Sequence, residues 1–135
     1  MEGAQIHINF LAVFVSSILA FVVGFLWYGP IFGKTWVKEM GFTEESLKKS
    51  NYALIFSFAF GLTLIIALNL SAFLGSEPNL VWGMTAGALA GIGWVSTSLG
   101  ITYLFGRKSL KLFFIDAGYS AVTYTLMGAI LGVWK

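Results

Sequence analysis

The segment Ile8–Trp36, "INFLAVFVSSILAFVVGFLWYGPIFGKTW", decides the class of this fold. A helix of about 20 mainly apolar residues crosses the roughly 30 Å hydrocarbon core of a bilayer, and Ile8–Tyr28 meets that length. The end of the segment, "FLWYGPIFGKTW", adds two tryptophans, a tyrosine, a Gly-Pro pair and the first lysine of the chain. The segment therefore predicts a membrane span that ends at the lipid headgroups.

The rest of the chain repeats this apolar character. Hydrophobic residues make up 58% of it and charged residues 10%, whereas a soluble domain has about 45–50% and about 25%. We expect three further spans, Tyr52–Leu74, Leu80–Phe105 and Leu112–Trp134. The composition predicts an all-α, integral membrane four-helix bundle, one domain over residues 1–135, in the lipid bilayer. A net charge of +2 is too small to indicate a nucleic-acid partner.

The basic residues predict the orientation of the bundle, because Lys and Arg are enriched in cytoplasmic loops. Seven of the eight lie in the loops after the first and third spans, and Lys135 is the exception. Both loops should therefore be cytoplasmic, and both termini should lie outside. The first span has no basic residue before it and no A-x-A site, so we do not expect it to be a cleaved signal peptide. The seven residues are Lys34, Lys38, Lys48, Lys49, Arg107, Lys108 and Lys111.

The aromatic end of the first span has two interpretations. Trp27 and Tyr28 carry amphipathic rings that prefer headgroup depth, and we expect Gly29 and Pro30 to end the helix. Lys34 would then lie among lipid phosphates. A membrane anchor explains these features. The Phe32-Gly33 pair that follows adds turn-forming residues that an anchor does not need, which favours a binding motif.

The loop after the first span should be ordered. "KTWVKEM" separates Trp36, Val37 and Met40 from its charged residues, which predicts a short interfacial helix in this first cytoplasmic loop. Thr43 is a candidate N-cap, and Glu44 follows it in the first turn. We therefore expect the second long helix to start near Glu44, about two turns before the bilayer.

Two segments resemble each other and suggest an internal repeat. Ile31–Lys38, "IFGKTWVK", follows the first span, and Leu104–Lys111, "LFGRKSLK", follows the third. A parallel repeat of two spans would explain the similarity, as in some transporters. The alternative is that glycine and basic residues end many cytoplasmic helices.

Glycines in the third and fourth spans predict close helix packing. In lipid, helices with small residues four apart approach closely, since little side chain separates their backbones. The pattern fits packing within one chain, which we expect first, or between chains of a homo-oligomer. The residues are Gly83, Gly87 and Gly91 in the third span and Gly128 and Gly132 in the fourth.

Three stretches together carry a family resemblance: "FLWYGPIFGKTW", "MGFTEE" and "LFFIDAGYSAVTYTLMGAILG". With them the chain resembles the bacterial domain-of-unknown-function family 1761, small four-helix membrane proteins. The resemblance implies four spans and a bacterial inner membrane location, and it implies no activity. The first motif matches at Trp27, Tyr28, Pro30, Phe32, Gly33, Lys34 and Trp36, and a second matches at Asp116, Ala117, Gly118 and Tyr119.

Asp116 is the only acid within the predicted spans, and an acid in a membrane is a functional-site hypothesis because its charge is costly to bury. The candidate polar site is Asp116 with Tyr119 of the family motif and with Ser120 and Thr123. Asp116 could form an interfacial ion pair, or it could bind a solute or proton. For the ion pair the candidate partners are Lys111, Lys108, Arg107 or a lysine of the first loop. Lys34 is the candidate if the Gly-Pro turn brings the motif back and clamps the first loop onto the fourth span.

Other chemistry has little support. Without cysteine, and with one histidine, the chain offers no convincing metal site. His7 and Asp116 belong to opposite membrane faces, which excludes a Ser-His-Asp set. We expect Asn9 and Asn69 to hydrogen-bond between the first two spans. No cofactor is expected.

Two functions remain open. The first is a non-enzymatic packing or partner-binding bundle, favoured by the small-residue seams and the few ionisable groups. The second is a small carrier or channel subunit for a small solute or ion, built around Asp116. An enzyme is not expected, and the sequence does not identify a small-molecule ligand. A water-accessible cavity that reaches Asp116, Ser120 and Thr123 would favour the second function.

Overall fold

The computed structural model describes residues 8–134 and confirms an all-α membrane fold. Four helices are long and apolar enough to cross a membrane: Phe10–Ile31, Tyr52–Leu74, Leu80–Phe105 and Leu110–Val133. In chain order the elements are α1 (Phe10–Leu26), the π-helical η2 (Trp27–Ile31), α2 (Gly33–Met40), α3 (Glu44–Lys48), α4 (Tyr52–Leu74), α5 (Leu80–Ala88), the π-helical η3 (Leu89–Ser96), α6 (Thr97–Phe105) and α7 (Leu110–Val133).

Each long span begins at a residue that caps it. A side-chain oxygen at such a position accepts a hydrogen bond from a free backbone N–H of the first turn. The acceptors and donors are Asn9 with Ala12, Asn51 with Leu54, Asn79 with Trp82 and Ser109 with Leu112. These caps fix where the spans start and explain why the loops between the helices lie at short polar stretches.

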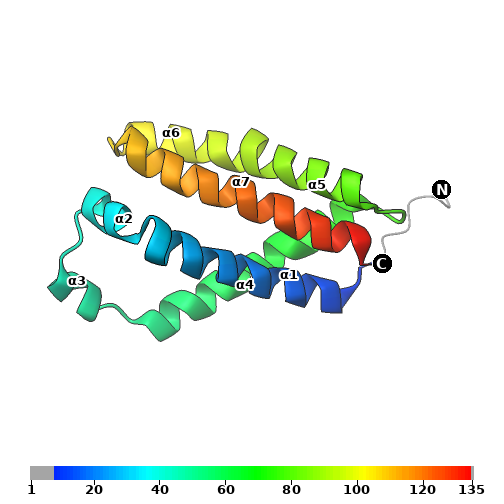
Figure 1. The fold of residues 1–135 in the computed structure, drawn as a ribbon, viewed down its shortest axis with the longest axis horizontal. Helices are drawn as coiled ribbons and strands as arrows, with labels where there is room; N and C mark the ends of the chain where they lie inside the picture. The colour runs from blue at the N-terminus through cyan, green and yellow to red at the C-terminus, as the bar shows by residue number, and fades with distance from the viewer. Residues whose placement is uncertain (1–7, 135) are drawn as a thin grey trace.

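Three spans lie side by side and the fourth crosses them. α7 runs between α1 on one side and α5, η3 and α6 on the other (Figure 1). α4 crosses α1, and its buried residues, Ala67, Leu70, Ser71 and Leu74, all lie in its last third. The Tyr52 end of α4 therefore diverges from the bundle. Its rings contact α1 through pairs such as Phe56 with Phe21, whose centroids are 6.3 Å apart.

The buried core is small and lies toward the end where α1 begins and α7 ends. Its members are mostly small aliphatic residues, and many large hydrophobic side chains point outward instead. An outward apolar surface is expected where acyl chains replace water. The core residues are Ala12, Val13, Ala20, Ala67, Leu70, Leu74, Ala86, Met127 and Leu131.

The first span does not end at Gly29 and Pro30, contrary to the sequence prediction. The helix continues through Pro30 as a π-helix to Ile31, and the Phe32 N–H donates to the Trp27 carbonyl, 2.9 Å away. Proline lacks the N–H of a regular helix and its ring crowds the preceding turn, and the wider π register accommodates both. Gly33 is required next, because a Cβ there would lie 2.6 Å from the Tyr28 carbonyl oxygen.

The predicted interfacial helix is present as α2, and Thr43 caps α3 as expected. The second long helix, however, does not begin near Glu44. α3 ends at Lys48 and α4 begins separately at Tyr52, where Asn51 provides a new cap. Asn and Ser compete for backbone hydrogen bonds and so interrupt a helix at this position.

Two further expectations differ from the structure. Asn9 caps α1 and Asn69 is exposed, so within residues 8–134 the two amides do not hydrogen-bond. Ile31–Lys38 is largely helical, whereas Leu104–Lys111 contains the turn between α6 and α7, with Arg107 at a φ of 56°. The two similar segments therefore do not share a local fold. His7, Lys135 and the rest of the N-terminal stub lie outside the described residues.

Candidate functional site

The site is organised by the π-helical end of the first span, which turns a pair of aromatic residues toward α7. The Trp27 indole N–H donates to the Ile115 carbonyl at 2.8 Å. Gly118 makes this approach possible, because a Cβ there would lie 2.9 Å from the Trp27 ring. The carbonyl of Ile115 sits one residue before Asp116, so η2 is held directly against the acid.

Asp116 accepts hydrogen bonds from three elements. Tyr28 of η2 donates to Oδ1 at 2.6 Å, and the Trp36 indole of α2 donates to the same oxygen at 3.1 Å. Tyr103 of α6 donates to Oδ2. Every donor is neutral, so the carboxylate is stabilised by directed dipoles rather than by a cation. We call Asp116, Tyr28, Trp36 and Tyr103 the acid cluster.

The predicted Lys34–Asp116 ion pair is wrong. Within residues 8–134 the one ion pair joins Lys49 to Glu45 at 3.1 Å, and Lys34 is exposed. A lysine at headgroup depth keeps its ammonium in water, while phenol and indole groups can enter the bundle at a smaller desolvation cost. The first loop does reach the fourth span, as expected, but through Tyr28 and Trp36.

Aromatic contacts brace the acid cluster from both sides. The Tyr28 ring lies 5.5 Å from the Trp36 ring and 5.3 Å from the Tyr119 ring. Trp27 packs 5.0 Å from Phe32. Tyr119 also donates to the Ala20 carbonyl at 2.9 Å, which ties α7 to α1. These contacts fix the rings that donate to Asp116.

Ser120 and Thr123, which belong to the predicted polar site, are buried but take no part in the hydrogen bonds of the acid cluster. Ser120 is buried and Thr123 is 2% exposed, and the Thr123 hydroxyl has no hydrogen-bond partner among the described residues. Nearby, the Ser96 hydroxyl donates to the Gly91 carbonyl at 2.7 Å and reaches the Ala117 carbonyl at 3.3 Å. Tyr119 faces α1. Within residues 8–134 neither Ser120 nor Thr123 hydrogen-bonds to Asp116, so the predicted polar site does not form one hydrogen-bonded group.

The glycines of the third and fourth spans meet in one interface. A Cβ added at Gly83 would overlap the Gly128 carbonyl, and one at Gly87 would overlap the Tyr124 carbonyl. At Gly91 it would lie 2.8 Å from the Ser120 carbonyl oxygen, and at Gly132 it would overlap the Asn79 carbonyl. This is the close backbone contact that small residues permit in lipid. It lies within one chain.

The sequence reading missed Tyr103 and Ser96 as site residues. Tyr103 is an aromatic residue near the end of a span, a position that fits an ordinary interfacial belt, so its type carried no specific signal. Ser96 depends on the π register of η3, which places its hydroxyl beside a carbonyl five residues earlier. A further link, Ser109 to Glu39 at 2.7 Å, joins the two predicted cytoplasmic loops.

Two hollows of the described structure lie away from Asp116. One of about 450 Å³ is at the opposite end of the bundle, and one of about 360 Å³ lies on the surface of α4. Residues 8–134 contain no group of three His, Asp or Glu side chains placed to hold a metal ion. The geometry of the acid cluster favours holding elements together over binding a solute.

Comparison with known proteins gives one match. No curated protein and no solved structure matches the chain. The family model described as "Protein of unknown function (DUF1761)" matches residues 11–132, a range that contains the acid cluster and both glycine sets. The chain belongs to the DUF1761 family.

Proposed function

We propose that the protein is a non-enzymatic, partner-binding membrane bundle, and that its first partner is α4 of a second copy. The observation that carries the proposal is the divergence of α4. No residue from Tyr52 to Ile66 is buried, and Phe58 and Leu62 are 67% and 61% exposed. A helix with no buried residue along this half is available for another membrane helix on the side that does not contact α1.

The outer face of α4 has the relief that helix pairing in lipid needs. Ala53, Ser57 and Gly61 follow one another at four-residue spacing, and a Cβ at Gly61 would meet nothing within 4 Å. Ser57 and Gly61 line a hollow of about 360 Å³ on this face. Phe58, Leu62 and Ile65 also line it. Small residues beside large ones form a groove and a ridge, which complement each other across a two-fold axis.

A similar face of small residues is already covered by another helix elsewhere in the chain. Gly83, Gly87 and Gly91 meet the backbone of α7 at contact distance. Gly61 carries the same pattern with no helix against it. This internal comparison favours a second helix as the occupant of α4.

The acid cluster supports a binding role because it uses the one described acid of the spans for structure. Three donors occupy the Asp116 oxygens, and they come from η2, α2 and α6. Holding these elements together fixes the end of the bundle from which α4 diverges.

Cross-linking in membranes tests the proposal. The chain has no cysteine, so Gly61→Cys would be the only thiol. Gly93→Cys is the matched control, since Gly93 is also an exposed glycine within a span with nothing within 4 Å of an added Cβ. We expect oxidation to give covalent dimers of Gly61→Cys and not of Gly93→Cys. Absence of the Gly61→Cys dimer, or equal yields for both, would contradict the proposal.

A small carrier or channel subunit is the second candidate. It is favoured by an acid without a described cation partner and by the unpaired Thr123 hydroxyl on the same helix. Proton flux into liposomes, followed with an enclosed pH-sensitive dye, tests it. A flux that wild type shows and a folded Asp116→Asn variant lacks would support the carrier; equal flux in both and in empty liposomes would exclude proton transport.

A further inference from the structure

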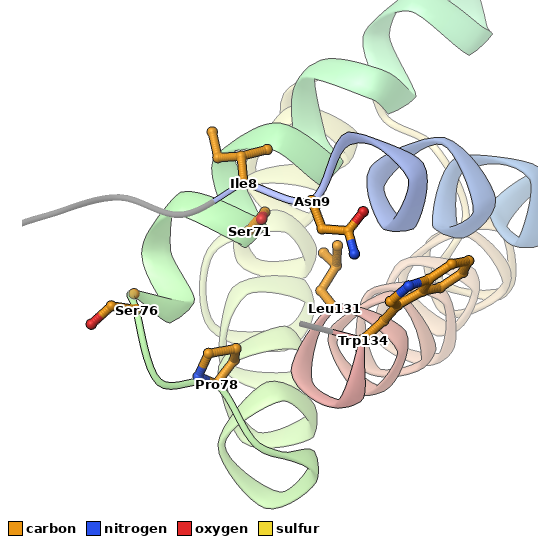
Figure 2. Close-up of a pocket in the computed structure, with 8 residues that line it drawn as sticks. Ile8, Asn9, Ser71, Ser76, Pro78, Leu131 and Trp134 are labelled. Atoms are coloured by element: carbon orange, nitrogen blue, oxygen red, sulfur yellow. The ribbon is translucent and has the colours of Figure 1, made fainter.

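A second feature of the molecule lies at the end of the bundle opposite the acid cluster. There the start of α1, the end of α4, the loop before α5 and the end of α7 enclose a cavity of about 450 Å³ (Figure 2). This volume is within the range of about 300–1,000 Å³ typical of small-molecule sites. It does not communicate with the proposed helix-pairing face, which lies on the other half of α4.

The cavity contains hydrogen-bond donors without acceptors. Asn9 uses its Oδ1 to accept from the Ala12 N–H at 3.1 Å, which leaves its amide nitrogen as a donor; Figure 2 shows the side chain extending toward Leu131. Ser71 lines the cavity and is only 8% exposed, and no hydrogen bond of its hydroxyl is present within residues 8–134. Both donors line the cavity, so a ligand inside it can accept from them.

The described walls favour an uncharged ligand. Among residues 8–134 no Asp, Glu, Lys or Arg lines the cavity, and Ile8, Pro78, Leu131 and Trp134 supply apolar surface. A buried charge would have no counterion among these residues, whereas a neutral oxygen would satisfy the donors at no such cost. The lining therefore combines apolar contact with donors directed at an uncharged acceptor.

From this arrangement we infer that the cavity binds a neutral carbonyl oxygen carried on an apolar body, with Asn9 and Ser71 as the donors. An ester of a membrane lipid and a small ester dissolved in water both have this chemistry. In each case the amide of Asn9 and the hydroxyl of Ser71 donate to the carbonyl, and the Trp134 indole covers the apolar part. No covalent step is involved.

Binding to the full-length chain in dodecyl maltoside, a detergent without a carbonyl group, tests the inference. Native mass spectrometry would measure the dissociation constants of dioleoylphosphatidylcholine, of its diether analogue, which lacks both carbonyls, and of triacetin, a water-soluble triester. We expect the diester to bind about tenfold more tightly than the diether, the ratio for one good hydrogen bond. Triacetin binding with the diester and diether alike would instead identify a soluble ester as the ligand.

Matched variants assign the effect to the cavity. Ser71→Ala removes one donor, and Asn9→Asp removes the other while its carboxylate still caps α1. Each should weaken the ester that binds by about tenfold, and Ser98→Ala, at an exposed serine of α6 outside the cavity and the pairing face, should have no effect. Thermal unfolding verifies that each variant is folded. Equal diester and diether affinities without triacetin binding, or affinities unchanged by Ser71→Ala, would overturn the inference.

Discussion

Asp116 shows how a single acid can be accommodated in a membrane bundle without a cation. Its two oxygens accept from Tyr28, Trp36 and Tyr103, which approach from three elements. The energetic consequence depends on how many donors lose their acceptor, since an unpaired buried donor costs more than a hydrogen bond gains. Substitutions at this residue should therefore be graded rather than all or none.

Asp116→Asn should destabilise the protein less than Asp116→Leu. The amide oxygen of Asn can still accept from Tyr28 and Trp36, and only the Tyr103 donor meets an NH₂ group, at a cost of about 1 kcal/mol. Leu leaves all three donors unpaired, at a cost of about 3 kcal/mol. Unfolding in mixed micelles would measure both. Equal losses would mean that Asp116 acts through a single contact.

Double-mutant cycles should locate the partner of Asp116. Trp36→Phe with Asp116→Leu should show a coupling of about 0.5–1.5 kcal/mol, because Leu removes the acceptor of the Trp36 indole. Lys34→Met with Asp116→Leu is the control and should be additive, since Lys34 is exposed and forms no described ion pair. Coupling to Lys34 without coupling to Trp36 would restore the ion-pair model.

The sequence predicted the proximity at this site but not its chemistry. Asp116 and the motif after the first span were expected at the same end, and the Gly-Pro turn was expected to return the chain to the bundle. Charge alone favours a lysine partner for an acid. Which aromatic N–H or O–H reaches the carboxylate depends on the π register of η2, and hydropathy carries no information on that register.

At the scale of elements, the seam between α5 and α7 is the tightest contact in the bundle. Gly83, Gly87 and Gly128 bring two backbones together where a single Cβ would overlap a carbonyl. Such contacts depend on dispersion and close fit, because lipid supplies no hydrophobic force between helices. The glycine spacing predicted the seam, and the opposed carbonyls show why each glycine is needed.

Gly87→Leu should disrupt the bundle, whereas Gly93→Leu should not. The two glycines lie six residues apart in the same span, but a side chain at Gly87 meets the α7 backbone and one at Gly93 meets open space. We expect Gly87→Leu to lower the free energy of unfolding by at least about 2 kcal/mol. Comparable stability of both variants would place the seam on a lipid-facing surface.

Span boundaries could be predicted closely because apolar length and capping residues are local properties of the sequence. The π-helical segments η2 and η3 inside the first and third spans could not be predicted from the sequence. η2 and η3 arise where Pro30 and the packing of Ser96 against α7 change the hydrogen-bond register. Pro30 acts on its own turn, and Ser96 acts through Ala117, 21 residues along the chain. A periodicity analysis includes neither effect.

At the scale of the whole molecule, the basic residues predict that the loops containing α2, α3 and the turn at Arg107 face the cytoplasm. Lys48→Cys and Lys108→Cys should be protected from an impermeant thiol reagent in intact cells, and Ser76→Cys should be labelled. Lys48 and Lys108 are exposed and cap no helix. Labelling in the reverse pattern would invert the topology.

The divergence of α4 was not predicted, since all four spans met the length and apolar character of a membrane helix and a regular bundle was the simplest arrangement. It follows from where α4 is held: its buried residues lie between Ala67 and Leu74, with Leu64 and Ile66 packed against the core, while the Tyr52 end follows the loop through α3 (Figure 1). In the proposed function, the row of small residues Ala53, Ser57 and Gly61 on that end is the partner-binding surface.

Subunit counting in lipid bilayers tests the central claim most directly. Single-molecule photobleaching of the labelled chain at low density would give the number of copies in each assembly. We expect two photobleaching steps for wild type and one for Gly61→Leu, with Gly93→Leu, its lipid-facing control, remaining at two. Single steps for wild type, or dimers that persist in Gly61→Leu, would contradict pairing through α4.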